Sequence, residues 1–121
     1  DNNLTGVTRT VNISDTHAIT DVNISLNITH TWDSDLILTL TSPSGTTVTL
    51  STNNGGPGND YLNTRFDDAG ITSITAGSAP FNATYIPEQP LSNFNGENPS
   101  GVWSLTVVDD TGADTGTLNN I

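Results

Sequence analysis

The chain has 121 residues, which suits one domain and leaves no room for a second. Thirteen acidic residues against Arg9 and Arg65 give a formal net charge of −11, which excludes nucleic acid and anionic membrane surfaces as partners. The chain contains no cysteine, so a disulfide framework is excluded as a source of stability.

No apolar run approaches the roughly 20 residues of a membrane-spanning helix. The chain begins at Asp1 without the features of a signal peptide. We therefore expect a monomeric domain, residues 1–121, that is processed or cut from a larger secreted protein.

Apolar and polar residues alternate in several segments, as they do in half-buried strands. Thr and Val are common where a helix would favour Ala, Glu or Lys, and no window of about 11 residues keeps a helical period. These segments predict strands, and Trp103 alternates with Leu105 and Val107 on the side expected to face the core. In chain order, the predicted strands lie at 22–29, 36–41, 48–50 and 103–108.

Turn-forming sequences separate the alternating segments. SPSG at 42–45 predicts a hairpin turn, because Pro43 presets its φ angle and Gly45 is free to adopt a positive one. NNGGPGND at 53–60 and FNGENPSG at 94–101 predict irregular loops. The chain is therefore predicted to be all-β, a jelly-roll β-sandwich of about eight mainly antiparallel strands.

Aspartates gather at the ends of two predicted strands: Asp33 and Asp35 precede 36–41, and Asp109, Asp110 and Asp114 follow 103–108. Loops at one end of a sandwich come together in space. Carboxylates about 4 Å apart repel by about 4 kcal/mol at an effective dielectric constant near 20. Bound Ca²⁺, which takes six to eight oxygen ligands, would reverse the sign of this interaction. We predict that these five residues form one calcium site.

A second calcium site is predicted from Asn54, Asp60, Asp67 and Asp68, which lie in or near the Gly-rich loop. Neither cluster has the spacing of an EF-hand. Magnesium fits less well because it retains its waters, and zinc fits poorly without cysteine. The alternative is that acids such as Asp109 and Asp114 are turn and capping residues.

We predict that the domain is not an enzyme. A Ser-His-Asp triad needs a base, and His17, in a polar turn, and His30, on a predicted strand, are the only histidines. The nucleophile motif G-x-S-x-G is absent. The aspartates lie in polar Gly, Asn and Thr loops, which favour ionised ligands over a catalytic acid of raised pKa.

Several segments together resemble the P domain, also called the P/homo B domain, of kexin- and furin-like subtilisin-family proteases and their bacterial relatives. These segments are THTWDSDLILTLTSPSGTTVTL (29–50), FDDAG (66–70), FNGENPSGVWSLTVVDD (94–110) and GADTGTLNNI (112–121). The matching residues are His30, Asp35, Leu36, Ser42, Pro43, Gly45, Thr46, Phe94, Gly96, Asn98, Pro99, Gly101, Trp103, Leu105, Asp109, Asp114, Gly116 and Leu118.

This resemblance implies a non-catalytic, calcium-binding jelly roll that follows the catalytic domain of a secreted serine protease. Its implied role is to support folding, stability or substrate engagement, with that catalytic domain and its protein substrates as partners. The sequence departs from the family at Ser34, where many members have Gly. It also stops at Ile121, where the family usually continues into an aromatic strand.

Two alternatives remain from the residues themselves. A calcium-loaded carbohydrate- or protein-binding module would present a row of exposed aromatic rings, for which Trp32, Tyr61 and Tyr85 are the candidates. An adhesin-like or structural module would have a role in stability only.

Overall fold

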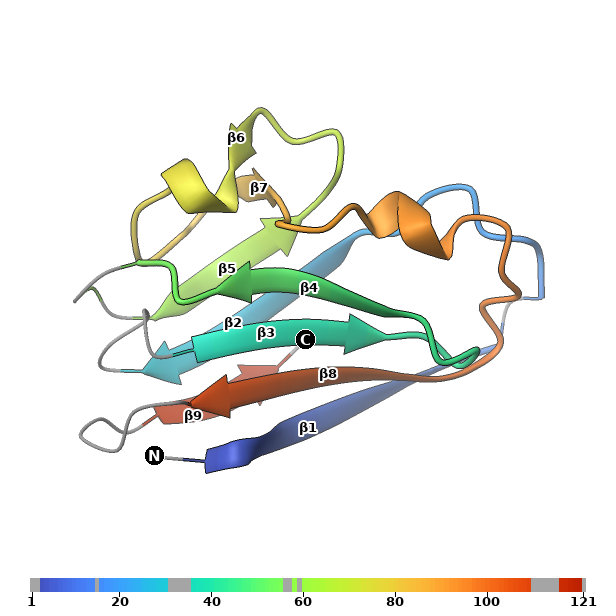
Figure 1. Ribbon diagram of the computed structural model, residues 1–121, viewed down its shortest axis with the longest axis horizontal. Helices are drawn as coiled ribbons and strands as arrows, with labels where there is room; N and C mark the ends of the chain where they lie inside the picture. The colour runs from blue at the N-terminus through green and yellow to red at the C-terminus, as the bar shows by residue number, and fades with distance from the viewer. Residues whose placement is uncertain are drawn as a thin grey trace.

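The computed structural model describes residues 3–14, 16–30, 36–55, 58, 60–109 and 116–120, which form two packed β-sheets (Figure 1). The four-stranded sheet has the order β1-β8-β3-β4, and the five-stranded sheet has the order β6-β7-β5-β2-β9. The strands are β1 (Asn3–Ile13), β2 (Ile24–His30), β3 (Leu36–Thr41), β4 (Thr47–Thr52), β5 (Tyr61–Phe66), β6 (Thr72–Ser73), β7 (Thr84–Ile86), β8 (Gly101–Asp109) and β9 (Gly116–Asn120).

The prediction of an all-β sandwich with mainly antiparallel strands is confirmed. The parallel pairs, β5 with β7 and β6 with β7, involve the short strands β6 and β7. Among the described residues, the short 3-10 helices η2 (Ile74–Ala76) and η3 (Leu91–Phe94) lie in the connections. Among the described residues, no helix is long and apolar enough to cross a membrane.

The core lies between the sheets and follows the predicted alternation. In β3, Leu36, Leu38 and Leu40 are buried, while the residues between them are half-exposed. Trp103 is 8% exposed and packs edge-on against Phe94, with ring centroids 5.0 Å apart. Its predicted place in the core is therefore confirmed.

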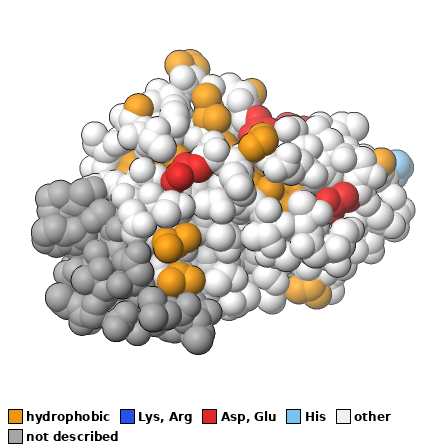
Figure 2. Space-filling view, in the orientation of Figure 1, with side chains coloured by type: hydrophobic (Ala, Val, Ile, Leu, Met, Phe, Trp, Pro, Cys, Tyr) orange, Lys and Arg blue, Asp and Glu red, His pale blue; other side chains and the backbone are white. Residues whose placement is uncertain are grey.

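The outer face of the four-stranded sheet carries hydroxyl side chains in two cross-strand rows. In Figure 2 the described surface is mostly white, with scattered hydrophobic and acidic side chains. The Thr8 and Thr106 hydroxyls lie 3.2 Å apart, and those of Thr41 and Thr47 lie 3.0 Å apart. Threonine suits such positions because its branched side chain packs well on a pleated surface. The rows are Thr8-Thr106-Thr39-Thr49 and Thr10-Ser104-Thr41-Thr47.

The predicted hairpin between β3 and β4 is confirmed. The Gly45 amide donates to the Ser42 carbonyl over 3.0 Å, and Gly45 has a φ of 93°. The strand boundaries differ from those predicted: the first alternating segment begins at Ile24 rather than Val22, and 48–50 and 103–108 lie inside longer strands. The alternation did not predict β1, β5, β6, β7 or β9.

Candidate functional site

The described residues that flank the first predicted calcium site are the last residues of β2 and β8 and the first residues of β3 and β9, and they lie at one end of the sandwich (Figure 1). Leu36 of β3 pairs with Asp109 of β8, and His30 of β2 pairs with Gly116 of β9. The segments 31–35 and 110–115 therefore leave the two sheets from paired positions. Asp33, Asp35, Asp110 and Asp114 lie outside the described residues, as does the side chain of Asp109. The ligand set stays a prediction.

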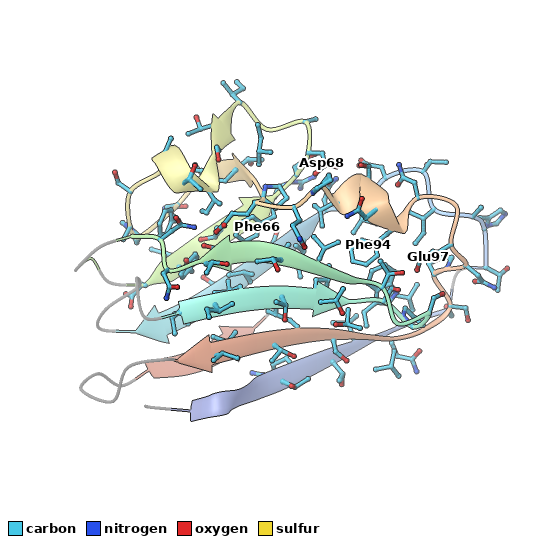
Figure 3. The ribbon with its side chains drawn as sticks, viewed as in Figure 1. Phe66, Asp68, Phe94 and Glu97 are labelled. Atoms are coloured by element: carbon cyan, nitrogen blue, oxygen red, sulfur yellow. The ribbon has the colours of Figure 1, made fainter. Side chains whose placement is uncertain are left out.

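Asp68, from the predicted second site, caps the 3-10 helix η3 across 23 residues of sequence (Figure 3). Its Oδ1 accepts from the Leu91 amide and its Oδ2 from the Ser92 amide, both over 2.8 Å. Pro90, at the N-cap position, makes no side-chain capping bond. A carboxylate from a distant loop thus satisfies amides that the local sequence leaves without partners.

Asp67 takes part in a polar cluster at the end of β5. Its Oδ1 accepts from the Ala69 amide over 2.9 Å, and its Oδ2 lies 3.7 Å from Nη2 of Arg65. The side-chain amide of Asn23 is oriented so that its nitrogen and its oxygen both have partners. The nitrogen donates to Asp67 and the oxygen accepts from Arg65, each over 3.0 Å. The Arg65 side chain is 47% exposed, so this ion pair contributes little to stability.

Asn54 belongs to a different network. Its Nδ2 donates over 2.8 Å both to Ser51 Oγ and to Glu88 Oε2, and Ser51 Oγ lies 3.0 Å from the buried Tyr61 hydroxyl. Asp60 has a φ of 73°, as expected for an Asp in a tight loop. No group of three or more His, Cys, Asp or Glu side chains that could hold a metal occurs within the described residues. The second site stays a prediction.

Glu97 is a structural residue that sequence reasoning missed (Figure 3). Its Oε1 accepts from the Ser42 hydroxyl over 2.7 Å, and its Oε2 accepts from the Thr46 hydroxyl over 2.6 Å. Its backbone carbonyl accepts from the Ile19 amide over 2.9 Å. We call this set of contacts the Glu97 clasp, and it joins the β3–β4 hairpin to the loop before β8. The available signal was a pair of hydroxyl residues in the turn sequence SPSGT, Ser42 at its start and Thr46 at its end.

The bonds of the clasp lower the pKa of Glu97. The Thr46 hydrogen bond has the largest effect, partial burial opposes it, and the hydrogen bonds from Ser42 and Ser44 lower the pKa further. The clasp therefore favours the ionised carboxylate. Ser42, in the SPSG turn, thus donates to a structural carboxylate.

The edge of the four-stranded sheet at β4 is covered by the segment that follows β7. The Glu88 amide donates to the Leu50 carbonyl and the Gln89 amide to the Thr49 carbonyl, both over 3.0 Å. The side chains of the same two residues accept hydrogen bonds from amides of β4: Gln89 Oε1 accepts from the Thr49 amide over 2.8 Å, and Glu88 Oε2 accepts from the Thr52 amide. This cover occupies backbone groups that an edge strand would otherwise expose.

Tyr61 and Tyr85, the candidates for exposed rings in the carbohydrate-binding alternative, are buried. Tyr61 is 0% and Tyr85 8% exposed, because both lie on strands and pack against Phe81 with centroids 4.8 Å and 5.6 Å away. Trp32 lies outside the described residues. No row of exposed rings occurs in the part of the chain that the structure describes, so no observation favours the carbohydrate-binding alternative.

Comparison with known proteins decides the family. The proprotein convertase P-domain family matches residues 19–121. The chain belongs to this family. As a P domain it shares 26% identity over 111 residues with a calcium-dependent protease of Trichormus variabilis, and the same identity with that of a Nostoc species.

The P domain also matches the crystal structure of the Aeromonas sobria serine protease with a TM-score of 0.53, at 19% identity over 94% of this chain. The same protease in complex with its chaperone gives 0.53 at 20% identity over 93%. These structures support the fold. The chain spans 14% of the length of each curated relative and 19% and 20% of the two structures.

Proposed function

We propose that this P domain is the non-catalytic accessory domain of a longer, secreted, subtilisin-like serine protease. It supports the folding, stability or substrate engagement of the catalytic domain. The observation that carries the proposal is that carboxylates in the family-like segments make structural hydrogen bonds. The carboxylate of Asp68 accepts hydrogen bonds from the 3-10 helix η3, and that of Glu97 accepts hydrogen bonds from the turn between β3 and β4, which are structural roles.

The proposal includes bound Ca²⁺ at the end of the sandwich where β8 finishes. The predicted ligands are Asp33, Asp35, Asp109, Asp110 and Asp114. The strand pairing supports this set, because Leu36 lies opposite Asp109 and His30 opposite Gly116, so the described residues that flank both acidic segments are neighbours. Carboxylate oxygens are the ligands that calcium prefers. Relatives named calcium-dependent proteases are consistent with such a site.

Thermal unfolding of the isolated chain, followed by calorimetry in millimolar calcium and in excess EGTA, tests the metal. At about 100 times its Kd, calcium that binds the native state alone adds roughly 2.7 kcal/mol of stability, which raises the Tm by several degrees. Identical Tm values in the two buffers would contradict bound calcium. The same scans test whether residues 1–121 unfold as one cooperative domain.

Excision of the P domain from the longer protease tests the accessory role. We expect the shortened protein to give a lower yield of active enzyme and a lower Tm. An active-site titration measures the yield, and calorimetry measures the Tm. Equal yield and equal Tm for both proteins would contradict the role.

A further inference from the structure

Two Asn-Gly pairs occur in the chain, Asn54-Gly55 after β4 and Asn95-Gly96 after η3. The backbone nitrogen of the glycine in such a pair can attack the asparagine side chain, because glycine has no Cβ to hinder the close approach. The reaction leaves a carboxylate in place of the side-chain amide. The surroundings of the two pairs differ, and they indicate which pair reacts first.

The glycine nitrogen of the second pair is held in a hydrogen bond. The Gly96 amide donates to the Ile19 carbonyl over 2.8 Å, and this bond must break before the nitrogen can attack Asn95. Among the described residues, the Gly55 nitrogen makes no such bond. Asn95 is the more exposed of the two asparagines, so exposure alone would favour reaction there. The hydrogen bond at Gly96 favours reaction at Asn54 instead.

The Asn54 side chain joins the end of β4 to the segment that covers this strand. This segment, residues 87–90, runs along β4 between β7 and η3, and we call it the β4 cover (Figure 1). Asn54 Nδ2 donates over 2.8 Å to Oε2 of Glu88 in the cover and to Oγ of Ser51 in the strand. A bond from an N–H to a carboxylate is a strong one. A carboxylate oxygen in place of this nitrogen would repel Glu88.

We propose that Asn54 is a site of spontaneous deamidation and that its conversion releases the β4 cover. The Gly55 nitrogen gives its proton to hydroxide, and its electron pair forms a bond to Cγ of Asn54. The Cγ–Nδ2 bond breaks, and Nδ2 leaves as ammonia with a proton taken from water. A second water opens the resulting five-membered imide at one of its two C–N bonds. The product is an aspartyl or isoaspartyl residue with one new negative charge.

The new charge acts on a segment with few backbone bonds. Only Glu88 and Gln89 of the β4 cover have an N–H, because Pro87 and Pro90 flank them. Their amides donate to carbonyls of β4, both over 3.0 Å. Deamidation removes the Asn54–Glu88 hydrogen bond and places two carboxylates together. The exchange rates of these two amides therefore report whether the cover is released.

Incubation of the chain in mildly alkaline buffer with EGTA, followed by peptide mapping in a mass spectrometer, measures the reaction at each pair. We expect Asn54 to be converted about fivefold faster than Asn95, because one backbone hydrogen bond has to break at the second pair. In concentrated urea, where that bond is lost, the two rates should agree within about twofold. Equal rates in the folded chain, faster reaction at Asn95, or the same ratio in urea would overturn the assignment.

Hydrogen exchange of the ¹⁵N-labelled chain in EGTA measures release of the β4 cover. Asn54→Asp carries the charge of the product and should speed exchange at Glu88 and Gln89 about tenfold. Asn95→Asp is the matched control, because it makes the same change at the other pair, and it should leave both rates within about twofold. Equal effects of the two variants, or unchanged exchange in Asn54→Asp, would overturn the release.

A double variant tests repulsion as the cause. In Asn54→Asp combined with Glu88→Gln, an N–H at position 88 can donate to the new carboxylate. Exchange at the amides of residues 88 and 89 should then return to within about twofold of the wild-type rate. Exchange that stays fast in the double variant would overturn repulsion between the two carboxylates as the cause of release.

Discussion

At the scale of single residues, Glu97 makes stability depend on pH in a defined direction. Its pKa is lower in the folded chain than its ordinary value, chiefly through the Thr46 hydroxyl. Its contribution is therefore fully present above the unfolded pKa, about 4.3, and is lost as the pH falls through the lower, folded value.

Glu97→Gln should remove this part of the pH dependence. We expect the Tm difference between wild type and variant to be largest near neutral pH and to shrink as the pH falls below about 4. Thermal unfolding monitored by circular dichroism from neutral pH to about pH 3 measures it. A difference that stays constant across this range would mean that Glu97 acts only through packing.

Asp68 should stabilise the fold without the help of calcium. Asp68→Ala leaves the Leu91 and Ser92 amides without their acceptor and should cost about 1 to 2 kcal/mol, as for the loss of a helix cap. Asp68→Asn keeps one acceptor oxygen and should recover part of that loss. Urea unfolding in calcium and in EGTA measures both variants. A loss confined to calcium buffer would instead make Asp68 a metal ligand.

At the scale of elements, Gly101 fixes how β8 starts. Its φ is 127°, and a Cβ added there would lie 2.9 Å from Cβ of Pro43 in the hairpin turn. Gly101→Ala should therefore cost about 1 to 2 kcal/mol from the backbone alone and more from the contact. Gly45→Ala is the matched control, because Gly45 also has a positive φ but open space around it. Equal urea midpoints for the two variants would exclude a role for the Pro43 contact.

The elements also show which parts of the fold the sequence could predict. Regular alternation identified β3 and the centre of β8, where the register runs without a shift. In β1 the charged Arg9 interrupts the apolar alternation of Val7, Val11 and Ile13, and in β5 the positive φ of Asn63 accompanies burial at Tyr61, Thr64 and Phe66. These irregularities break the period of two residues that the prediction used.

For the candidate site, the sequence could predict only that certain strand ends lie near one another. Pairing of Leu36 with Asp109 agrees with the expectation that two acidic segments meet. The capping role of Asp68 and the Glu97 clasp could not be predicted, because each depends on partners 23 or more residues away. A local pattern carries no information on such pairs, so both carboxylates could be read only as a ligand or as surface charge.

At the scale of the whole molecule, the question is what balances a net charge of −11. If calcium does so at the end of β8, Asp114→Ala should lower the Tm in calcium by several degrees and have little effect in EGTA. Asp21→Asn is the control, since it removes one exposed charge far along the sequence from the proposed ligands. Calorimetry of both variants in both buffers gives the comparison. Equal losses for Asp114→Ala in the two buffers would exclude it as a ligand.

The cover over β4 has a consequence for behaviour at high concentration. Uncovered strand edges recruit edges of other molecules and start fibrils. Here Glu88 and Gln89 already occupy amides and carbonyls of Thr49, Leu50 and Thr52. If this segment detaches, the chain would thus expose a strand edge that can start a fibril before its core unfolds. Aggregation during storage should accordingly follow the detachment of residues 88 and 89 rather than the melting temperature.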